Sequence, residues 1–224
     1  MEEVEAINRI GWPVKEILCI GAEAFIFKID FFGEDAVLKI RIKKDYRDPK
    51  IDSMIRMKRT QTESFLLNKV KTVGIPAPTL LFLDLNNHYL ILEYIKGVLL
   101  KNALRTGKVD WRKVAIKMGE DVAKMHEIDI VHGDLTTSNI FCTNSGLIYF
   151  DFGLGEITKE LEDKAVDIEL LYRVMRSTHP EISDRFMEEF LRSYRGSYSA
   201  APDVISRYKR IRLMGRYVVR SKRA

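Results

Sequence analysis

The chain has 224 residues, of which 46% are apolar and 31% charged, a balance that excludes an intrinsically disordered protein. Every apolar run is shorter than the roughly 18 residues that a membrane helix needs, and the acidic start Met-Glu-Glu is not that of a signal peptide. We therefore expect a cytoplasmic protein that contacts no membrane. The two cysteines, Cys19 and Cys142, make neither a disulfide framework nor a metal-binding pattern.

The net charge of +5 is concentrated in two stretches of the chain. Residues 41–59 carry eight lysines and arginines against three aspartates, and the residues after Asp203 carry eight lysines and arginines and no acid. A basic arm without counter-charges attracts phosphate-rich partners such as RNA. A tail that serves only solubility would have the same composition, so both interpretations are open at this point.

The first half of the chain predicts a small antiparallel sheet with one helix. After a helical or irregular lead-in over residues 1–16, alternating apolar residues indicate two strands within residues 16–29. The turn between them consists of Gly21, Ala22, Glu23 and Ala24. Further strands are expected at residues 35–40, 79–85 and 89–94. The turn between the last two contains His88, which we expect in solvent.

Lys39 stands among apolar residues of its predicted strand, so it is either at a solvated edge or buried with a partner. Glu63 is the natural partner, because it lies in a helical pattern that runs from about Asp52 to Gly74. The side chain of Asp52 would cap that helix. A strand lysine paired with a helix glutamate is how protein kinases hold the α- and β-phosphates of ATP.

The chain is then expected to leave the sheet and become helical. Residues 93–97 have the features of a linker between two lobes, and in that case the Glu93 carbonyl and the Ile95 amide would face the adenine edge of a nucleotide. Asp110 is expected to cap a helix whose core stripe consists of Trp111, Ala115, Met118, Val122 and Met125. Further helices are predicted from Asp163, over residues 184–194 and from about Pro202.

The stretch 130–154 combines two polar loops with a short strand pair between them. Its loops carry Asp134, Asn139 and Asp151, whose oxygens suit a hard cation such as Mg²⁺. An acid five residues before an amide, followed by Asp-Phe-Gly on the next strand, is the spacing of the protein-kinase catalytic and metal loops. In that scheme Asp134 takes or orients the proton of the attacking hydroxyl, and Asn139 and Asp151 hold magnesium. The alternative is a polar hairpin of turn-forming residues. His132 is expected to pack and hydrogen-bond.

Several motifs, taken together, resemble the PRPK family, the small atypical kinase subunits of the KEOPS complex. They are the turn 21–24, the stretches 45–52 and 59–60, the catalytic run 132–139, the run 162–167 and the segment 177–180. The resemblance covers nearly the whole chain and implies a bilobal protein-kinase-like fold of the α+β class. Residues 1–94 would form an N-lobe with a small antiparallel sheet and one main helix, and residues 95–224 a reduced helical C-lobe.

The resemblance also implies an activity. Such proteins bind ATP and Mg²⁺, act as atypical serine/threonine kinases that phosphorylate themselves, and hydrolyse ATP within a complex that makes threonylcarbamoyladenosine (t6A) on tRNA. The implied partners are the KEOPS catalytic subunit of the sugar-kinase fold, a small KEOPS regulatory subunit and tRNA. The expected ATP-binding residues are Gly21, Ala22, Glu23, Ala24, Lys39, Glu63, Glu93 and Ile95. The expected tRNA contacts are Arg212, Arg216, Arg220, Lys222 and Arg223.

The chain departs from ordinary protein kinases in ways that bear on its reaction. No Ala-Pro-Glu follows Asp151, and the segment before Asp163 is too short for the activation loop that forms a peptide-substrate platform. Thr136 stands where ordinary kinases carry a lysine that steadies the transferring phosphate, which slows transfer to a hydroxyl. Water is still available as acceptor, so these departures favour ATP hydrolysis. The basic tail is also looser than the arginine-glycine-arginine run usual in the family.

Two alternatives stay open. A RIO-type or aminoglycoside-type kinase would share the His-x-Asp loop, although the run Asp163–Asp167 argues against both. A nucleotide-sensing scaffold that holds a partner enzyme and tRNA would need no turnover, although every catalytic position is filled.

Overall fold

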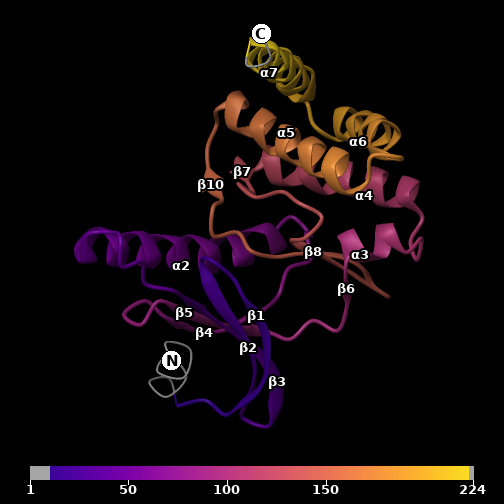
Figure 1. Ribbon diagram of the computed structural model, residues 1–224. Coiled ribbons are helices and arrows are strands. Elements are labelled where there is room, and N and C mark those ends of the chain that lie inside the picture. The colour runs from indigo at the N-terminus through magenta and orange to yellow at the C-terminus, as the bar shows by residue number, and fades with distance from the viewer. Residues whose placement is uncertain (1–10, 222–224) are drawn as a thin grey trace. The chain divides into compact units, whose positions relative to one another are not determined.

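The computed structural model describes the backbone of residues 11–221 (Figure 1). Side chains are described for residues 11–214. The chain forms two compact units. One comprises the described chain up to Lys69 and Ala77–Lys96, and the other comprises Val70–Pro76 and the chain from Gly97 onward. The sequence predicts one division, after Tyr94. In the structure the chain enters the second unit at Val70–Pro76, returns to the first, and leaves it finally after Lys96.

The first unit contains a five-stranded sheet in the order β1-β2-β3-β5-β4, in which every neighbouring pair is antiparallel. The sheet that the sequence predicts is therefore confirmed. Its strands are β1 (Val14–Ile20), β2 (Ala24–Phe31), β3 (Glu34–Arg41), β4 (Leu80–Asp84) and β5 (Tyr89–Glu93).

The two faces of β3 have different roles, because successive side chains of a strand point to opposite faces. Ala36, Leu38 and Ile40 belong to a buried apolar cluster together with alternate residues of β2. Lys39 and Arg41 alternate with them and therefore lie on the opposite face. Helix α2 (Pro49–Lys71) covers that face, since its side chains bond both of these cations.

Helix α2 begins three residues earlier than expected, and Asp48 caps it. The Asp48 carboxylate accepts hydrogen bonds from the backbone amides of Lys50 (2.9 Å) and Ile51 (3.2 Å). The prediction that Asp52 is the cap is wrong, because Asp52 lies inside the first turn and is fully buried. There it accepts a 2.7 Å bond from Arg56 instead.

The expectation that His88 lies in solvent is also wrong. The residue is 4% exposed and adopts a φ of 58° in the turn between β4 and β5. Its Nε2 lies 3.2 Å from the Ser53 hydroxyl of α2, so this turn is packed against the helix. Burial lowers the pKa of His88. Nothing in the local sequence distinguishes this histidine from one in an exposed hairpin turn.

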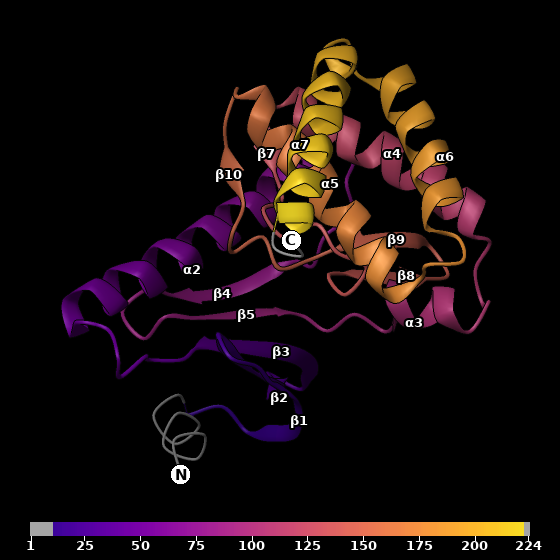
Figure 2. The same cartoon turned by 45° about the horizontal axis from the view of Figure 1, so that its top comes forward.

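The second unit is mainly helical. Its helices are α3 (Leu100–Arg105), α4 (Trp111–Glu127), α5 (Leu161–Thr178), α6 (Ser183–Ser197) and α7 (Ala201–Ser221). Its short strands are β6 (Val98–Leu99), β7 (Ile130–Val131), β8 (Ile140–Thr143), β9 (Gly146–Tyr149) and β10 (Glu156–Ile157). Helix α6 packs on α4, and α7 packs along α5 (Figure 2). Within residues 11–221, every helix is too short or too polar to cross a bilayer.

Helix α4 is the centre of this unit and follows its sequence prediction closely. Asp110 caps it by accepting a 3.0 Å bond from the Arg112 amide. Four of the five predicted stripe residues are buried, and Trp111 is half-buried. Gly119 is required where α6 crosses, because a Cβ there would lie 2.4 Å from the Phe190 carbonyl oxygen.

The cap of α2 can be tested by replacing Asp48 with alanine. We expect the free energy of unfolding to fall by about 1 kcal/mol, because two amides of the first turn lose their acceptor. The control is Asp45→Ala, whose side chain is 78% exposed and pairs only with Lys43 at the surface. Urea unfolding followed by circular dichroism measures both, and equal stabilities would contradict the assignment of the cap.

The buried His126 of α4 predicts a pH dependence of stability. Its Nδ1 lies 2.8 Å from the Tyr194 hydroxyl of α6, and its Nε2 lies 3.6 Å from the Asp167 carboxylate of α5. Burial lowers the pKa of His126 more than Asp167 raises it. The unfolded chain therefore binds a proton below about pH 6.5 that the folded chain does not bind, and the free energy of unfolding should fall as the pH drops below that value.

Urea unfolding at several pH values between about 7.5 and 5.5 measures this dependence. The His126→Gln variant should show a shallower slope than the unaltered chain. The slope should not vanish, because His88 and His179 are also buried with a lowered pKa. Identical slopes for the two proteins would show that His126 takes no part.

Candidate active site

The predicted pairing of Lys39 with Glu63 is confirmed within the first unit. The Lys39 Nζ lies 2.7 Å from Glu63 Oε1, and both side chains are buried. Strand β3 supplies the lysine and the middle of α2 the glutamate. Because a buried charge is costly unless it is paired and hydrogen-bonded, this contact holds both groups in defined positions.

Arg41 is a member of this cluster that the sequence reasoning missed. Its Nη2 lies 2.5 Å from Glu63 Oε2, so each oxygen of the carboxylate takes one cation. The same guanidinium nitrogen also approaches the Arg59 carbonyl oxygen at 3.4 Å. The signal was available, since Arg41 stands two residues after Lys39 and must share its face of the strand.

Besides the pairing of Ala24 with Arg41 in the sheet, three contacts tie the turn 21–24 to the rest of the first unit. The Glu23 carbonyl accepts a 3.1 Å bond from the Ile42 amide, and the Ala22 carbonyl accepts one from the Lys44 ammonium. The Glu23 carboxylate forms a 2.6 Å ion pair with Arg59 of α2. Gly21 closes the turn by donating its amide to the Ala24 carbonyl at 3.0 Å.

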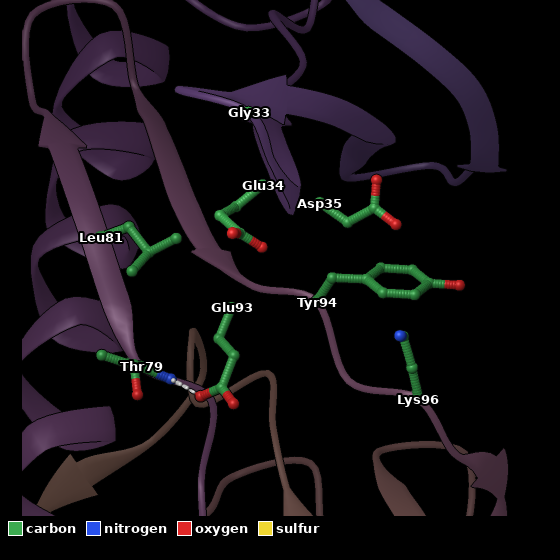
Figure 3. Close-up of a pocket in the computed structure, with 8 residues that line it drawn as sticks. All are labelled: Gly33, Glu34, Asp35, Thr79, Leu81, Glu93, Tyr94 and Lys96. Atoms are coloured by element: carbon green, nitrogen blue, oxygen red, sulfur yellow. Dashed lines mark hydrogen bonds between the residues drawn. The ribbon is translucent and has the colours of Figure 1, made fainter.

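The predicted adenine contacts lie at the end of β5 and just beyond it. The Glu93 side chain accepts a 3.0 Å bond from the Thr79 amide, and the half-buried Ile95 follows in an irregular segment. Glu93 lines a 630 Å³ pocket (Figure 3) together with Gly33, Glu34, Asp35, Thr79, Leu81, Tyr94 and Lys96. Three carboxylates and one lysine line this pocket, and this excess of negative charge makes it unsuited to phosphates. Ile95 is not among the lining residues.

In the second unit, the structure brings Asp134 and Asn139 together. Both hydrogen bonds of the Asn139 Nδ2 go to Asp134, one to its carbonyl oxygen (2.9 Å) and one to its carboxylate Oδ2 (2.8 Å). The Asn139 Oδ1 is therefore the end of the amide that can accept a cation. The Asn139 carbonyl in turn accepts a 3.1 Å bond from the Phe150 amide, which places the neighbouring Asp151 beside this loop.

Asp151 and Gly133 both have a positive φ, which the sequence does not predict. Asp151 adopts a φ of 62°, which is unusual for an aspartate and concentrates at functional sites in proteins. Gly133 adopts a φ of 76°, and a Cβ there would lie 2.0 Å from the Leu154 carbonyl oxygen. Gly133 is thus needed for the close approach of the loop 132–139 to the segment after Asp151.

Asp167 of α5 anchors the loop 132–139. Its carboxylate accepts bonds from the His132 amide (2.6 Å) and the Gly133 amide (2.8 Å). The His132 ring is fully buried, with its centroid 4.4 Å from that of Phe152, so its predicted packing role is confirmed. The run 162–167 is one of the motifs singled out in the sequence. Only the structure shows that Asp167 of this run bonds the loop.

The oxygen donors of this unit fit a magnesium ion. Asp134, Asn139 and Asp151 offer two carboxylates and an amide oxygen, and Mg²⁺ prefers few protein ligands, which substrate phosphates and water complete. Throughout the described part of the chain, no group of three or more His, Cys, Asp or Glu side chains could hold a metal ion. A metal bound here would therefore depend on the Asn139 amide and on oxygens from outside the protein.

The basic arm is less uniform than its sequence indicates. Arg207 pairs with Glu162 at 3.4 Å, so the expectation that it lacks a counter-charge is wrong. The Arg212 guanidinium stacks on the Tyr172 ring at 3.8 Å and donates a 2.6 Å bond to its hydroxyl, which gives it a packing role within the unit. The side chains of Arg216 and Arg220, and all of Lys222 and Arg223, lie outside the described residues.

Comparison with known proteins identifies the family. The model of the RIO domain family matches residues 28–176, more than half of the chain. This range contains the run Asp163–Asp167, so the argument that this run speaks against a RIO-type kinase is wrong. Among solved structures, the Rio2 kinase of Chaetomium thermophilum matches with a TM-score of 0.62 and 13% identity, covering 96% of this chain and 76% of that one. Its ADP/Mg²⁺-phosphoaspartate complex matches with a TM-score of 0.58 and 14% identity, covering 96% and 75%. These likenesses confirm the protein-kinase-like fold.

Curated relatives narrow the family further. The chain is 37% identical over 211 residues to the KEOPS complex subunit Bud32 of Pyrococcus abyssi, covering 90% of this chain and 96% of that protein. It is 38% identical over 205 residues to an EKC/KEOPS complex subunit of Schizosaccharomyces pombe, covering 88% and 86%. A probable bifunctional tRNA threonylcarbamoyladenosine biosynthesis protein of Methanobrevibacter smithii is 39% identical over 222 residues. That match takes in 96% of this chain, which spans 40% of the relative. The chain belongs to the RIO-domain family of atypical kinases and, within it, to the Bud32 family of KEOPS complex subunits.

Proposed function

We propose that this chain is a Mg²⁺- and ATP-dependent atypical serine/threonine kinase and ATPase that supports t6A formation on tRNA within a KEOPS-type complex. The observation that carries the proposal is the bonded group Asp134–Asn139, with Asp151 held beside it through the Phe150 amide. This group supplies a proton acceptor and hard oxygen ligands in a single loop pair. The buried pair of Lys39 and Glu63 supplies a positioned cation for phosphates.

In this proposal the first unit binds the nucleotide. Lys39, held by Glu63, contacts the phosphates, and backbone amides of the turn 21–24 cover them. The Glu93 carbonyl and the Ile95 amide bond the adenine edge. Each of these assignments rests on the family relationship and on the placement of the residues within the unit.

Asp134 is the proposed base, or the group that positions the attacking water. Asn139 donates to its Oδ2, which fixes the carboxylate and leaves Oδ1 to accept a proton. The Asn139 amide oxygen and the Asp151 carboxylate are the protein ligands for Mg²⁺. When bound, this ion neutralises charge on the β- and γ-phosphate oxygens.

Two observations favour water over a protein hydroxyl as acceptor. Thr136 is neutral, so no cation stands at this position of the loop. Its hydroxyl accepts a 3.3 Å bond from the Ser138 amide. The segment after Asp151 is short, and its strand β10 pairs with β7, which leaves little chain for a peptide-substrate platform. ATP hydrolysis is therefore the proposed main reaction, with autophosphorylation as a side reaction.

The relatives suggest the partners. The Pyrococcus and Schizosaccharomyces proteins are subunits of KEOPS complexes, and the Methanobrevibacter protein combines a matching region with a longer remainder. We propose that the remainder corresponds to a catalytic subunit of the sugar-kinase fold, and that a subunit of this kind is a partner of the present chain. A small regulatory subunit and tRNA are the other proposed partners. A cytoplasmic location is consistent with this role and stays a prediction.

Replacing Asp134 by asparagine separates an enzyme from a nucleotide-sensing scaffold. We expect ATP turnover to fall by about 10²–10⁴-fold, the usual effect of losing an acid–base group, while ATP binding persists. Asp110→Asn is the control, since asparagine caps a helix as well as aspartate does. Radiolabelled ATP with Mg²⁺ shows free phosphate and labelled protein together, for the chain alone and with its proposed catalytic partner and tRNA. Unchanged t6A formation by the assembled Asp134→Asn variant would favour the scaffold.

The basic arm should contribute to tRNA binding. Deleting the chain from Arg216 onward removes four of the eight cations after Asp203 and should weaken tRNA binding in a salt-dependent manner, without a change in ATP affinity. A control of equal length, with these four cations replaced by glutamine, should behave like the deletion. Filter binding at several salt concentrations measures the effect. Unchanged tRNA binding would show that the arm is only a solubilising tail.

A further inference from the structure

We infer that Arg59 of α2 is a positioning residue that holds the turn 21–24 in place for the nucleotide through its ion pair with Glu23. The inference rests on the proposed function, because it assumes that this turn covers the phosphates of ATP. It assigns Glu23 a different task from the one that the sequence indicates. The Glu23 side chain is an anchor for the turn, and the backbone of the turn does the binding.

The composition of the turn creates the need for an anchor. A kinase loop with three glycines can bring its backbone close to phosphate, whereas this turn has only Gly21. Here the backbone is set by contacts from outside: the Ile42 amide and the Lys44 ammonium bond its carbonyls, and Arg59 bonds its side chain at 2.6 Å. Only the last of these comes from α2.

The charge of Glu23 strengthens the argument. A carboxylate beside a phosphate-binding turn repels the ligand unless a cation neutralises it. Glu23 is 51% exposed and Arg59 28%, so the pair is screened by solvent and contributes little to the stability of the fold. Its effect on a ligand that carries several negative charges is larger, because without Arg59 the carboxylate would face the phosphates unpaired.

The position of Arg59 couples the turn to the Lys39 cluster. Arg59 lies one helical turn before Glu63, and its carbonyl oxygen accepts a 3.4 Å bond from Arg41. The segment 59–63 of α2 therefore contacts the turn 21–24 through Arg59 and the cation cluster through Glu63. Displacing this segment would disturb both parts of the nucleotide site at once.

A charge-swap cycle tests the inference on the full chain. The variants are Glu23→Arg, Arg59→Glu and the double variant Glu23→Arg/Arg59→Glu, with Lys58→Glu as the matched control. Lys58 is exposed, adjacent to Arg59 and outside all the contacts of the turn, so its replacement makes the same change in net charge. The dissociation constant of Mg²⁺-ATP is measured by calorimetry, and thermal unfolding is followed in parallel.

We expect Arg59→Glu to raise the dissociation constant about three- to tenfold, with little change in melting temperature, and the double variant to recover most of the affinity. Glu23→Arg leaves two cations facing each other and should also displace the turn, and Lys58→Glu should bind like the unaltered chain. Arg59→Glu binding as tightly as Lys58→Glu, or a double variant no better than the single ones, would overturn the inference.

Lys39→Ala distinguishes a failure of this inference from a failure of the proposed function. If the unaltered chain binds no Mg²⁺-ATP, or if Lys39→Ala binds it unchanged, then the proposed nucleotide site is wrong. In that case the failure lies in the proposed function and not in the pairing of Arg59 with Glu23. If Lys39→Ala loses affinity while the Glu23 and Arg59 variants keep it, the nucleotide site stands and the anchor is wrong.

Discussion

The carboxylate of Glu63 is the interaction on which the first unit depends. It is fully buried, and a buried carboxylate is tolerated only when its oxygens are paired. Lys39 and Arg41 take one oxygen each, so a single side chain of α2 fixes two cations of β3. Losing one partner of a buried ion pair commonly costs about 3–5 kcal/mol. Helix α2 and strand β3 are thereby fixed to each other, and Arg41 gives Glu63 a second partner besides Lys39.

A second buried carboxylate has the corresponding task in the other unit. Asp167 of α5 accepts two amides of the loop 132–139 and lies 3.6 Å from His126 of α4, so it holds the backbone just before Asp134. In the neighbouring loop after β9, Asp151 has a positive φ, which a residue other than glycine keeps only where surrounding contacts determine it. Gly133 adopts its positive φ without strain, but its place beside the Leu154 carbonyl leaves no room for a side chain. In both units, therefore, helix carboxylates without a direct part in chemistry orient the groups that are proposed to act.

Much of the fold could be predicted from the sequence. The five strands, the cap at Asp110 and the buried stripe of α4 follow from local alternation and periodicity, because each depends on residues near to one another in the chain. The pairing of Lys39 with Glu63 spans 24 residues and could be predicted because Glu63 lies in a helical pattern that follows the lysine's strand, the order in which protein kinases carry this pair. The cap of α2 was misplaced because Asp48 and Asp52 are both plausible caps, and burial of Asp52 is decided by arginines around it.

The sequence by itself determined the residue types of the site and their order: a strand lysine, a helix glutamate, and oxygen donors at positions 134, 139 and 151. Residue types and their spacing along the chain can be read directly from the sequence. Only the tertiary structure decided which side chains meet across long separations. It pairs Arg41 with Glu63 and Arg59 with Glu23. It also bonds Asp167 to the loop 132–139 and stacks Arg212 on the Tyr172 ring. Each of these contacts joins side chains or backbone groups of different elements. Because the sequence contains many lysines and arginines, it does not show which of them will pair with a given buried carboxylate.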